Sequence, residues 1–152
     1  MVRTMRLRRP LGKSRSLHDK LNGMSEQNSE QEIAEFASKL FDLARNGDIT
    51  LVEYIKQGVS VDMVNQDGQS FVMLAAYNGH PELVKALAEV GADVNLLNDR
   101  NQSPLAGAIF KKEDAVIDAL LEAGANPNAG TPNAVDTAKM FGREDLVARF
   151  ES

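Results

Sequence analysis

Residues 67–99 read DGQSFVMLAAYNGHPELVKALAEVGADVNLLND, and residues 100–132 read RNQSPLAGAIFKKEDAVIDALLEAGANPNAGTP. Laid over each other with an offset of 33, the two stretches share nine identical residues, whereas average composition would give about two. Three glycines keep the same spacing along the chain: Gly58, Gly91 and Gly124. An internal repeat of this length predicts stacked units that bury their apolar faces against one another.

Each period carries local signals for a helix, a turn, a second helix and a loop. Ser70 and Ser103 are suited to cap a first helix, and Pro104 follows where a missing N–H costs nothing. Gly79 suits the left-handed conformation that closes this helix. The apolar positions of the second helix recur with helical spacing: Leu83, Val84, Leu87 and Val90. The rest of the period is rich in Asn, Asp, Pro and Gly and predicts an extended, turn-forming connection.

These residues resemble a known family. Residues 67–84, continued by Leu87 and by residues 91–95, are similar to the ankyrin repeat consensus, and residues 100–129 look like a second copy. A weaker first copy is similar at residues 41–58, and a truncated last one at residues 134–147.

The resemblance implies an all-α ankyrin-repeat solenoid of about four stacked helix-turn-helix repeats with short β-turn fingers. We expect the repeats at residues 30–66, 67–99, 100–129 and 130–152.

The chain departs from the family pattern at several places. Met73 and Ala106 stand where the family has a histidine that links neighbouring loops. Lys112 occupies the turn position held elsewhere by glycine, which costs up to about 1 kcal/mol if its backbone is left-handed. The connection before the last repeat is about three residues short, so the finger at residues 128–130 is expected to be stubby.

Both ends of the stack carry polar signals. The sequence Ser29-Glu30-Gln31-Glu32 has a capping-box pattern, which predicts that the first helix begins there and runs through Ile33, Phe36 and Leu40. Arg149, Glu151 and Ser152 make the last helix polar where an internal repeat would be apolar. Terminal repeats with polar outer faces are what a stack of repeats needs.

Charge divides the chain at about residue 23. Residues 1–23 carry seven basic residues and one acid, whereas residues 24–152 have a net charge of -11. We expect residues 1–23 to be a disordered basic extension and residues 24–152 to be the repeat domain. Three interpretations of the extension stay open: an organelle transit peptide, an arm that contacts phosphates, or sequence upstream of a true start at Met24.

The residue inventory argues against catalysis. The chain has no cysteine and two histidines, His18 in the basic extension and His80, which the resemblance makes a structural loop residue. No nucleophile with a convincing base, no phosphate loop and no cluster with metal spacing is found, so we expect no catalytic residue, cofactor or metal. Four acids are expected at second-helix starts, where they complement the helix dipole: Asp48, Glu82, Glu144 and Asp145.

A binding role has positive support. In ankyrin stacks the loop tips and the ends of the first helices line a concave face that binds partners. The positions before each turn, carried over residue by residue, are Arg45, Asn46, Tyr77, Asn78, Phe110, Lys111, Met140 and Phe141. Three of the eight aromatic residues fall in this column. The finger residues Asp67, Gln69, Arg100 and Gln102 are expected to form a polar rim. In the competing interpretation, Phe110 and Phe141 pack between adjacent helices.

The sequence therefore predicts a cytoplasmic, monomeric, non-catalytic protein that binds another protein. The charge of -11 favours a partner with a basic face and disfavours nucleic acid at the repeats. No stretch is apolar over the length that crosses a bilayer. The alternative is a charge-driven tether, in which residues 1–23 attach to nucleic acid or a membrane surface and the repeats dock a client.

Overall fold

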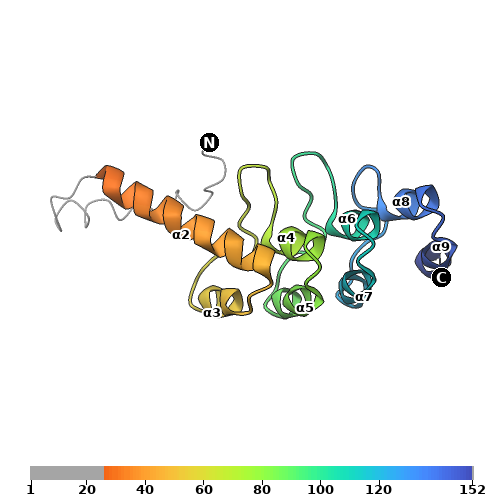
Figure 1. The fold of residues 1–152 in the computed structure, drawn as a ribbon, viewed down its shortest axis with the longest axis horizontal. Coiled ribbons are helices and arrows are strands. Elements are labelled where there is room, and N and C mark those ends of the chain that lie inside the picture. The colour runs from red at the N-terminus through yellow and green to blue at the C-terminus, as the bar shows by residue number, and fades with distance from the viewer. Residues whose placement is uncertain (1–25, 152) are drawn as a thin grey trace.

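A computed structural model of the chain describes residues 26–151, and the expectations for residues 1–23 and for Ser152 lie outside that part. The described residues form eight helices in two rows (Figure 1). The inner row, which lies nearer the fingers, consists of α2 (Glu26–Asn46), α4 (Phe71–Tyr77), α6 (Pro104–Phe110) and α8 (Ala134–Met140). The outer row consists of α3 (Thr50–Lys56), α5 (Pro81–Glu89), α7 (Asp114–Glu122) and α9 (Glu144–Glu151). The expected all-α solenoid of stacked helix pairs is confirmed.

The first helices begin where the sequence predicts them. The Ser70 Oγ accepts a hydrogen bond from the Met73 N–H at 3.1 Å, and the Ser103 Oγ accepts one from the Ala106 N–H at 3.1 Å. Each bond satisfies an amide that has no partner within its own helix. Asn133, which the sequence did not single out, caps α8 in the same way, with its Oδ1 2.8 Å from the Asp136 N–H.

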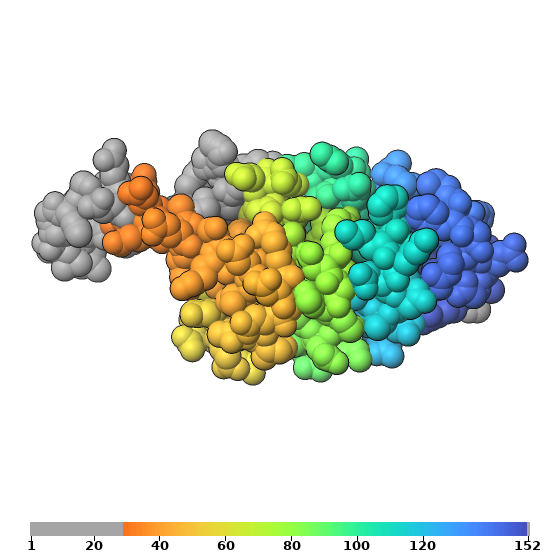
Figure 2. Space-filling view, in the orientation of Figure 1, coloured from red at the N-terminus to blue at the C-terminus, as the bar shows by residue number. Residues whose placement is uncertain are grey.

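The core lies between successive helix pairs. Six of the seven residues of α4, Phe71 to Ala76, are buried, and the Phe71 ring contacts that of Phe41 on α2 at a centroid distance of 5.1 Å. In α5 the buried residues are Leu83, Val84 and Leu87, at the helical spacing expected. Because each pair packs only on its neighbours, the repeats follow one another as bands along the long axis (Figure 2).

The turn that joins the two helices of a repeat uses left-handed backbone each time. Gly47, Gly79 and Gly142 have φ of 71°, 78° and 68°, and Lys112 has φ of 61° at the equivalent place. Only glycine adopts this region without strain. The backbone of Lys112 is therefore left-handed, which is the condition under which the sequence predicts a cost for a residue other than glycine.

The loops between repeats form the fingers (Figure 1). The first two loops have fourteen residues each, 57–70 and 90–103, and the third has eleven, 123–133. The shorter last finger is as expected. Backbone bonds join successive fingers, from the Asp99 N–H to the Asp67 carbonyl at 3.1 Å and from the Thr131 N–H to the Asn101 carbonyl at 2.9 Å.

The predicted start of the first helix is wrong. Helix α2 already includes Glu26, three residues before Ser29, so Ser29 lies inside the helix and does not cap it. The residues before Ser29, Glu26 to Asn28, contain no proline or glycine that would stop a helix. With 21 residues, α2 is three times as long as α4, and its N-terminal part projects beyond the stack (Figure 1).

The last helix is polar, as predicted. Only Leu146 is buried in α9. The Arg149 guanidinium is not merely solvated, because its Nη1 lies 2.9 Å from the Asp118 Oδ1 on α7. No helix among residues 26–151 is both long enough and apolar enough to cross a membrane.

Candidate functional site

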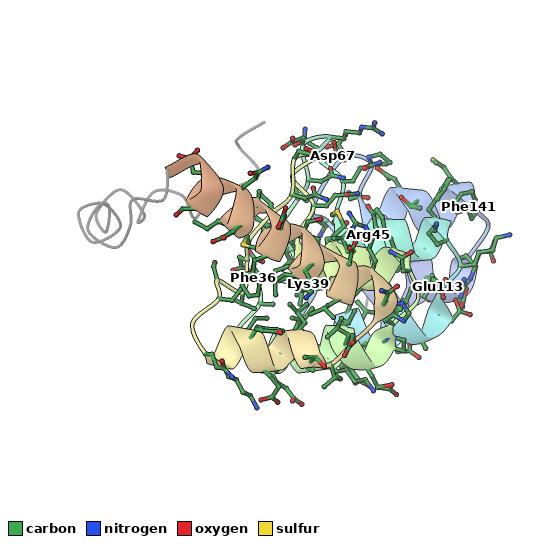
Figure 3. All side chains as sticks on the ribbon, turned by 60° about the vertical axis from the view of Figure 1, so that its left-hand side comes forward. Phe36, Lys39, Arg45, Asp67, Glu113 and Phe141 are labelled. Atoms are coloured by element: carbon green, nitrogen blue, oxygen red, sulfur yellow. The ribbon has the colours of Figure 1, made fainter. Side chains whose placement is uncertain are left out.

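The predicted binding residues lie in one row, where the inner helices end at the turns. Arg45 and Asn46 close α2, and the matching positions close α4, α6 and α8. The inner helices pack side by side in the order α2, α4, α6, α8, so their ends follow one another along the stack. Figure 3 shows Arg45 at the end of α2 and Phe141 near the C-terminal end of the row.

Three large apolar side chains in this row are exposed. Phe110 is 64% exposed, Met140 65% and Phe141 40%. The rings of Phe110 and Phe141 contact each other across adjacent repeats, with centroids 5.6 Å apart and planes tilted by 46°. The two rings thus pack against each other across adjacent repeats, as the competing interpretation expects, and both still present apolar surface outward.

Tyr77 occupies the matching position of the preceding repeat but is only half-exposed. Its ring packs over Gly107 of α6, where a Cβ on Gly107 would overlap ring atoms. Burial raises the pKa of the Tyr77 phenol to about 12. Tyr77 therefore contributes to packing between repeats as well as to the row.

The polar members of the row make local bonds. The Asn78 side chain donates to the Leu74 carbonyl at 2.8 Å, and Arg45 forms an exposed ion pair with Asp42 at 2.8 Å. Lys111 is exposed, and no hydrogen bond or ion pair joins its ammonium group to another described residue.

The predicted rim residues divide into two kinds. Asp67 and Arg100 are exposed on the fingers, and Figure 3 shows Asp67 on the first of them. Gln69 and Gln102 are half-buried and hold the fingers together. The Gln69 Oε1 accepts from the Asn65 Nδ2 at 3.1 Å, and the Gln102 Oε1 accepts from the Asn98 Nδ2 at 2.8 Å.

Asn65 and Asn98 are the residues that sequence reasoning missed. The Asn65 Oδ1 accepts from the backbone N–H of Asp67 at 2.9 Å and of Gln69 at 3.0 Å, and Asn98 repeats both bonds one period later. Both side chains are 8% exposed. A signal was present, because an asparagine precedes each rim glutamine by four residues with the 33-residue offset.

The turn residues reach back to the preceding repeat. The His80 Nε2 lies 2.8 Å from the Arg45 carbonyl, which confirms its structural role. Arg143 binds Asp114 on α7 at 3.1 Å and Asp145 at 3.0 Å, and its hydrogen bond lowers the pKa of Asp145. At the start of α3, the Thr50 N–H donates to the Asp48 Oδ1 at 2.9 Å and lowers the pKa of Asp48. The four acids lie at outer-helix starts as predicted.

Charge is distributed unevenly between the two rows. The outer helices hold nine acids and three bases. The acids are Glu53, Glu82, Glu89, Asp114, Asp118, Glu122, Glu144, Asp145 and Glu151, and the bases are Lys56, Lys85 and Arg149. In the inner row, α4 and α6 carry no charge, α8 carries Asp136 and Lys139, and α2 holds five acids and two bases. The outer row thus has a net charge of -6 and α2 of -3, whereas α4, α6 and α8 together are neutral.

A groove of about 860 Å³ lies between α2 and α3 at the N-terminal end of the stack. Apolar side chains dominate its lining, among them Phe36, which is 40% exposed and meets the Tyr54 ring edge-on at 5.5 Å. Its carboxylate, Asp62, already accepts a hydrogen bond from the Asp93 N–H at 2.9 Å. Across residues 26–151, no three His, Cys, Asp or Glu side chains are placed to hold a metal ion.

Comparisons with known proteins agree on the family of these repeats. A family model described as ankyrin repeats (3 copies) matches residues 40–131, which is more than half of the chain. A protein of Pseudomonas aeruginosa named as an ankyrin repeat protein is 40% identical over 57 residues, which make up 37% of this chain and 33% of that one.

Two further matches come from mammals. An inactive serine/threonine-protein kinase of Mus musculus, TEX14, is also 40% identical over 57 residues, 37% of this chain and 4% of that protein. The crystal structure of the human ASB11 ankyrin repeat domain superposes with a TM-score of 0.54 at 35% identity, covering 58% of this chain and 40% of that one. The matches thus span a third or less of the curated relatives' length.

Proposed function

Because this chain belongs to the ankyrin repeat family, whose repeats generally serve as protein–protein interaction modules, we propose that it is a non-catalytic protein that binds another protein. The partner contacts the ends of the inner helices and the tips of the fingers. The observation that carries the proposal is the exposed cluster of Phe110, Met140 and Phe141. Aromatic residues and methionine are enriched at interfaces, and exposed apolar clusters commonly mark them.

The polar surroundings fit the same role. Asp67 and Arg100 stand exposed on the fingers and supply a polar rim. Within the described residues, the single histidine is His80, and its ring is engaged with the backbone of the preceding repeat. Binding without chemistry is the role these side chains support.

The proposal extends to the setting in which the protein works. We infer a monomer that works in the cytoplasm. We further infer that the protein partner has a basic face, because residues 24–152 have a net charge of -11. Such a charge attracts a basic surface during approach and repels nucleic acid from the repeats.

The test replaces the aromatic residues of the row. The variant Tyr77→Ala/Phe110→Ala/Phe141→Ala is expected to lose partner capture from an extract of the native host, because truncating central aromatic anchors typically costs about 2 kcal/mol or more each. Captured proteins are identified by mass spectrometry, and binding is then measured with the purified partner. Unchanged affinity for that partner would contradict the proposal.

Two controls separate binding from folding. Because Tyr77 also packs on Gly107, the pair Phe110→Ala/Phe141→Ala is measured alongside the triple variant. Phe36→Ala removes an aromatic ring that is as exposed as that of Phe141. Phe36 lies on α2 but is not one of the predicted binding residues. It is expected to leave capture unchanged, and circular dichroism checks that all variants keep their helix content.

The tether remains a second candidate, favoured by the net charge of +6 in residues 1–23. In that case a chain that starts at Met24 would lose its binding to DNA or to anionic lipid vesicles, and the binding of the full chain would fall steeply with salt. Under the main proposal, the chain that starts at Met24 captures the protein partner as well as the full chain does.

A further inference from the structure

We propose that the C-terminal half of the row recognises an acidic segment of the partner that carries aromatic or other apolar anchors. The proposed binding site is the Lys-Phe patch, which comprises Phe110, Lys111, Lys112, Lys139, Met140 and Phe141. This inference rests on the proposed function, because it uses the same face, and it names the chemistry of the segment that is bound.

The patch is built from two short stretches at neighbouring helix ends. Residues 110–112 close α6, residues 139–141 close α8, and these two helices pack against each other. Contact between the Phe110 and Phe141 rings brings the stretches together. All six residues are exposed. The patch thus combines an apolar centre with three exposed lysines that lie next to it in the sequence.

The three lysines are not neutralised locally. None of them forms an ion pair with another described residue, whereas Arg45, Arg143 and Arg149 all pair with aspartates. Asp136, one turn before Lys139, makes no ion pair with it.

The neighbouring acids face elsewhere. Asp114 and Asp145 bind Arg143, and the Glu113 carboxylate packs against Gly79 of the preceding repeat (Figure 3 shows Glu113). A partner carboxylate can therefore supply the missing counter-charge for the lysines.

The backbone of Lys112 is a second, independent observation. At the three equivalent turns the residue is glycine, and Lys112 adopts the same left-handed conformation with φ of 61°. A side chain with a Cβ is strained there, and strained residues cluster at functional sites. The strain is accounted for if the Lys112 ammonium is used in binding.

The charge pattern of the whole stack favours an acidic peptide over a nucleic acid as the ligand of the patch. The acidic outer row repels an acidic segment, so the basic patch is where such a segment can settle. Single-stranded RNA also combines negative charge with flat rings, but its continuous phosphate backbone would meet the negative charge of the rest of the stack. An acidic peptide of limited length is the better match. A basic face elsewhere on the same partner would still be attracted by the outer row.

The test uses a fluorescently labelled random copolymer of glutamate and tyrosine, with fluorescence polarisation as the readout. Polyglutamate provides the charge without the rings, and polyuridylate provides the nucleic-acid alternative. We expect the full chain to bind the Glu-Tyr copolymer about tenfold more tightly than either of the other polymers, because rings and carboxylates are both matched. Equal binding of polyglutamate, or tighter binding of polyuridylate, would overturn the inference.

Charge variants locate the binding. Lys111→Glu/Lys139→Glu is expected to weaken copolymer binding about tenfold or more. Lys112→Gly is expected to weaken it severalfold without lowering the thermal midpoint, because glycine suits the turn better. The control Lys56→Glu/Lys85→Glu makes the same charge change on the outer row and is expected to have no effect. A control as damaging as the patch variant would show diffuse attraction and would overturn the inference.

The two proposals fail in different ways. If the aromatic variant loses the purified partner while Lys111→Glu/Lys139→Glu binds both partner and copolymer normally, the acidic segment is wrong and the binding face stands. If neither the aromatic nor the lysine variant affects partner binding, the face itself is wrong.

Discussion

At the scale of single residues, the stack depends on matches between a large side chain in one repeat and a small one in the next. Tyr77 and Gly107 are the clearest case, since the ring of the first covers the Cα of the second. Gly107 lies inside α6 and has no positive φ, so its backbone does not require glycine. Space for the Tyr77 ring is what requires it.

This match leads to a stability prediction. Gly107→Ala should lower the free energy of unfolding by up to about 2 kcal/mol, because overpacking against Tyr77 costs about 1–3 kcal/mol, against the roughly 1 kcal/mol that alanine gains in a helix. Urea unfolding followed by circular dichroism measures the change.

The double variant Tyr77→Ala/Gly107→Ala provides the control. With the ring removed, the alanine at position 107 should no longer be harmful, and the second substitution should stabilise the protein in the Tyr77→Ala background. A stabilising effect of Gly107→Ala in the wild-type background would show that the ring moves aside without cost.

At the scale of elements, the sequence predicts correctly the features that a short stretch of chain determines by itself, such as helix caps and turns. Ser70 and Ser103 cap their helices, Gly79 closes one, and Lys112 adopts the left-handed turn expected of a glycine position. The start of α2 was missed because a capping-box pattern is a local preference, and the preceding residues extend the helix past it.

The details of the candidate site were less predictable, for a physical reason. The column of residues follows from the repeat period, but its surface depends on contacts between repeats. Neither the contact between Phe110 and Phe141 nor the bonds from Asn98 to the rim residue Gln102 can be read from one helix. The charge pattern likewise required knowing which row each helix joins.

At the scale of the whole molecule, a stack in which each repeat contacts only its neighbours should not be equally stable along its length. Burial already differs between repeats, since six residues of α4 are buried whereas α9 buries Leu146 alone. The helix pairs in the middle of the stack have a neighbouring pair on both sides, whereas the last pair, which includes α9, has a neighbour on one side only. The C-terminal end is therefore expected to open before the middle does.

Native-state hydrogen exchange tests this gradient. Amide protection should be greatest in α4 to α7 and should fall through α8 to α9, because local opening there exposes the least apolar surface. Leu146→Ala should speed exchange in α8 and α9 and leave α4 unchanged. Equal protection along the chain, or equal acceleration by this substitution, would mean that the stack unfolds as a single unit.

The finger bonds have a consequence for how such a protein changes length. All the bonds that Asn65 and Asn98 make fall within five consecutive residues, and the tie from the Asp62 carboxylate to the Asp93 amide recurs from Asn95 to Asn126. A copy of residues 67–99 inserted at its own boundary would therefore meet the same donors and acceptors at both joints. Duplication of a gene segment would thus lengthen this protein with its finger bonds already matched, whereas Tyr77 of the first copy would meet Leu74 of the second in place of Gly107.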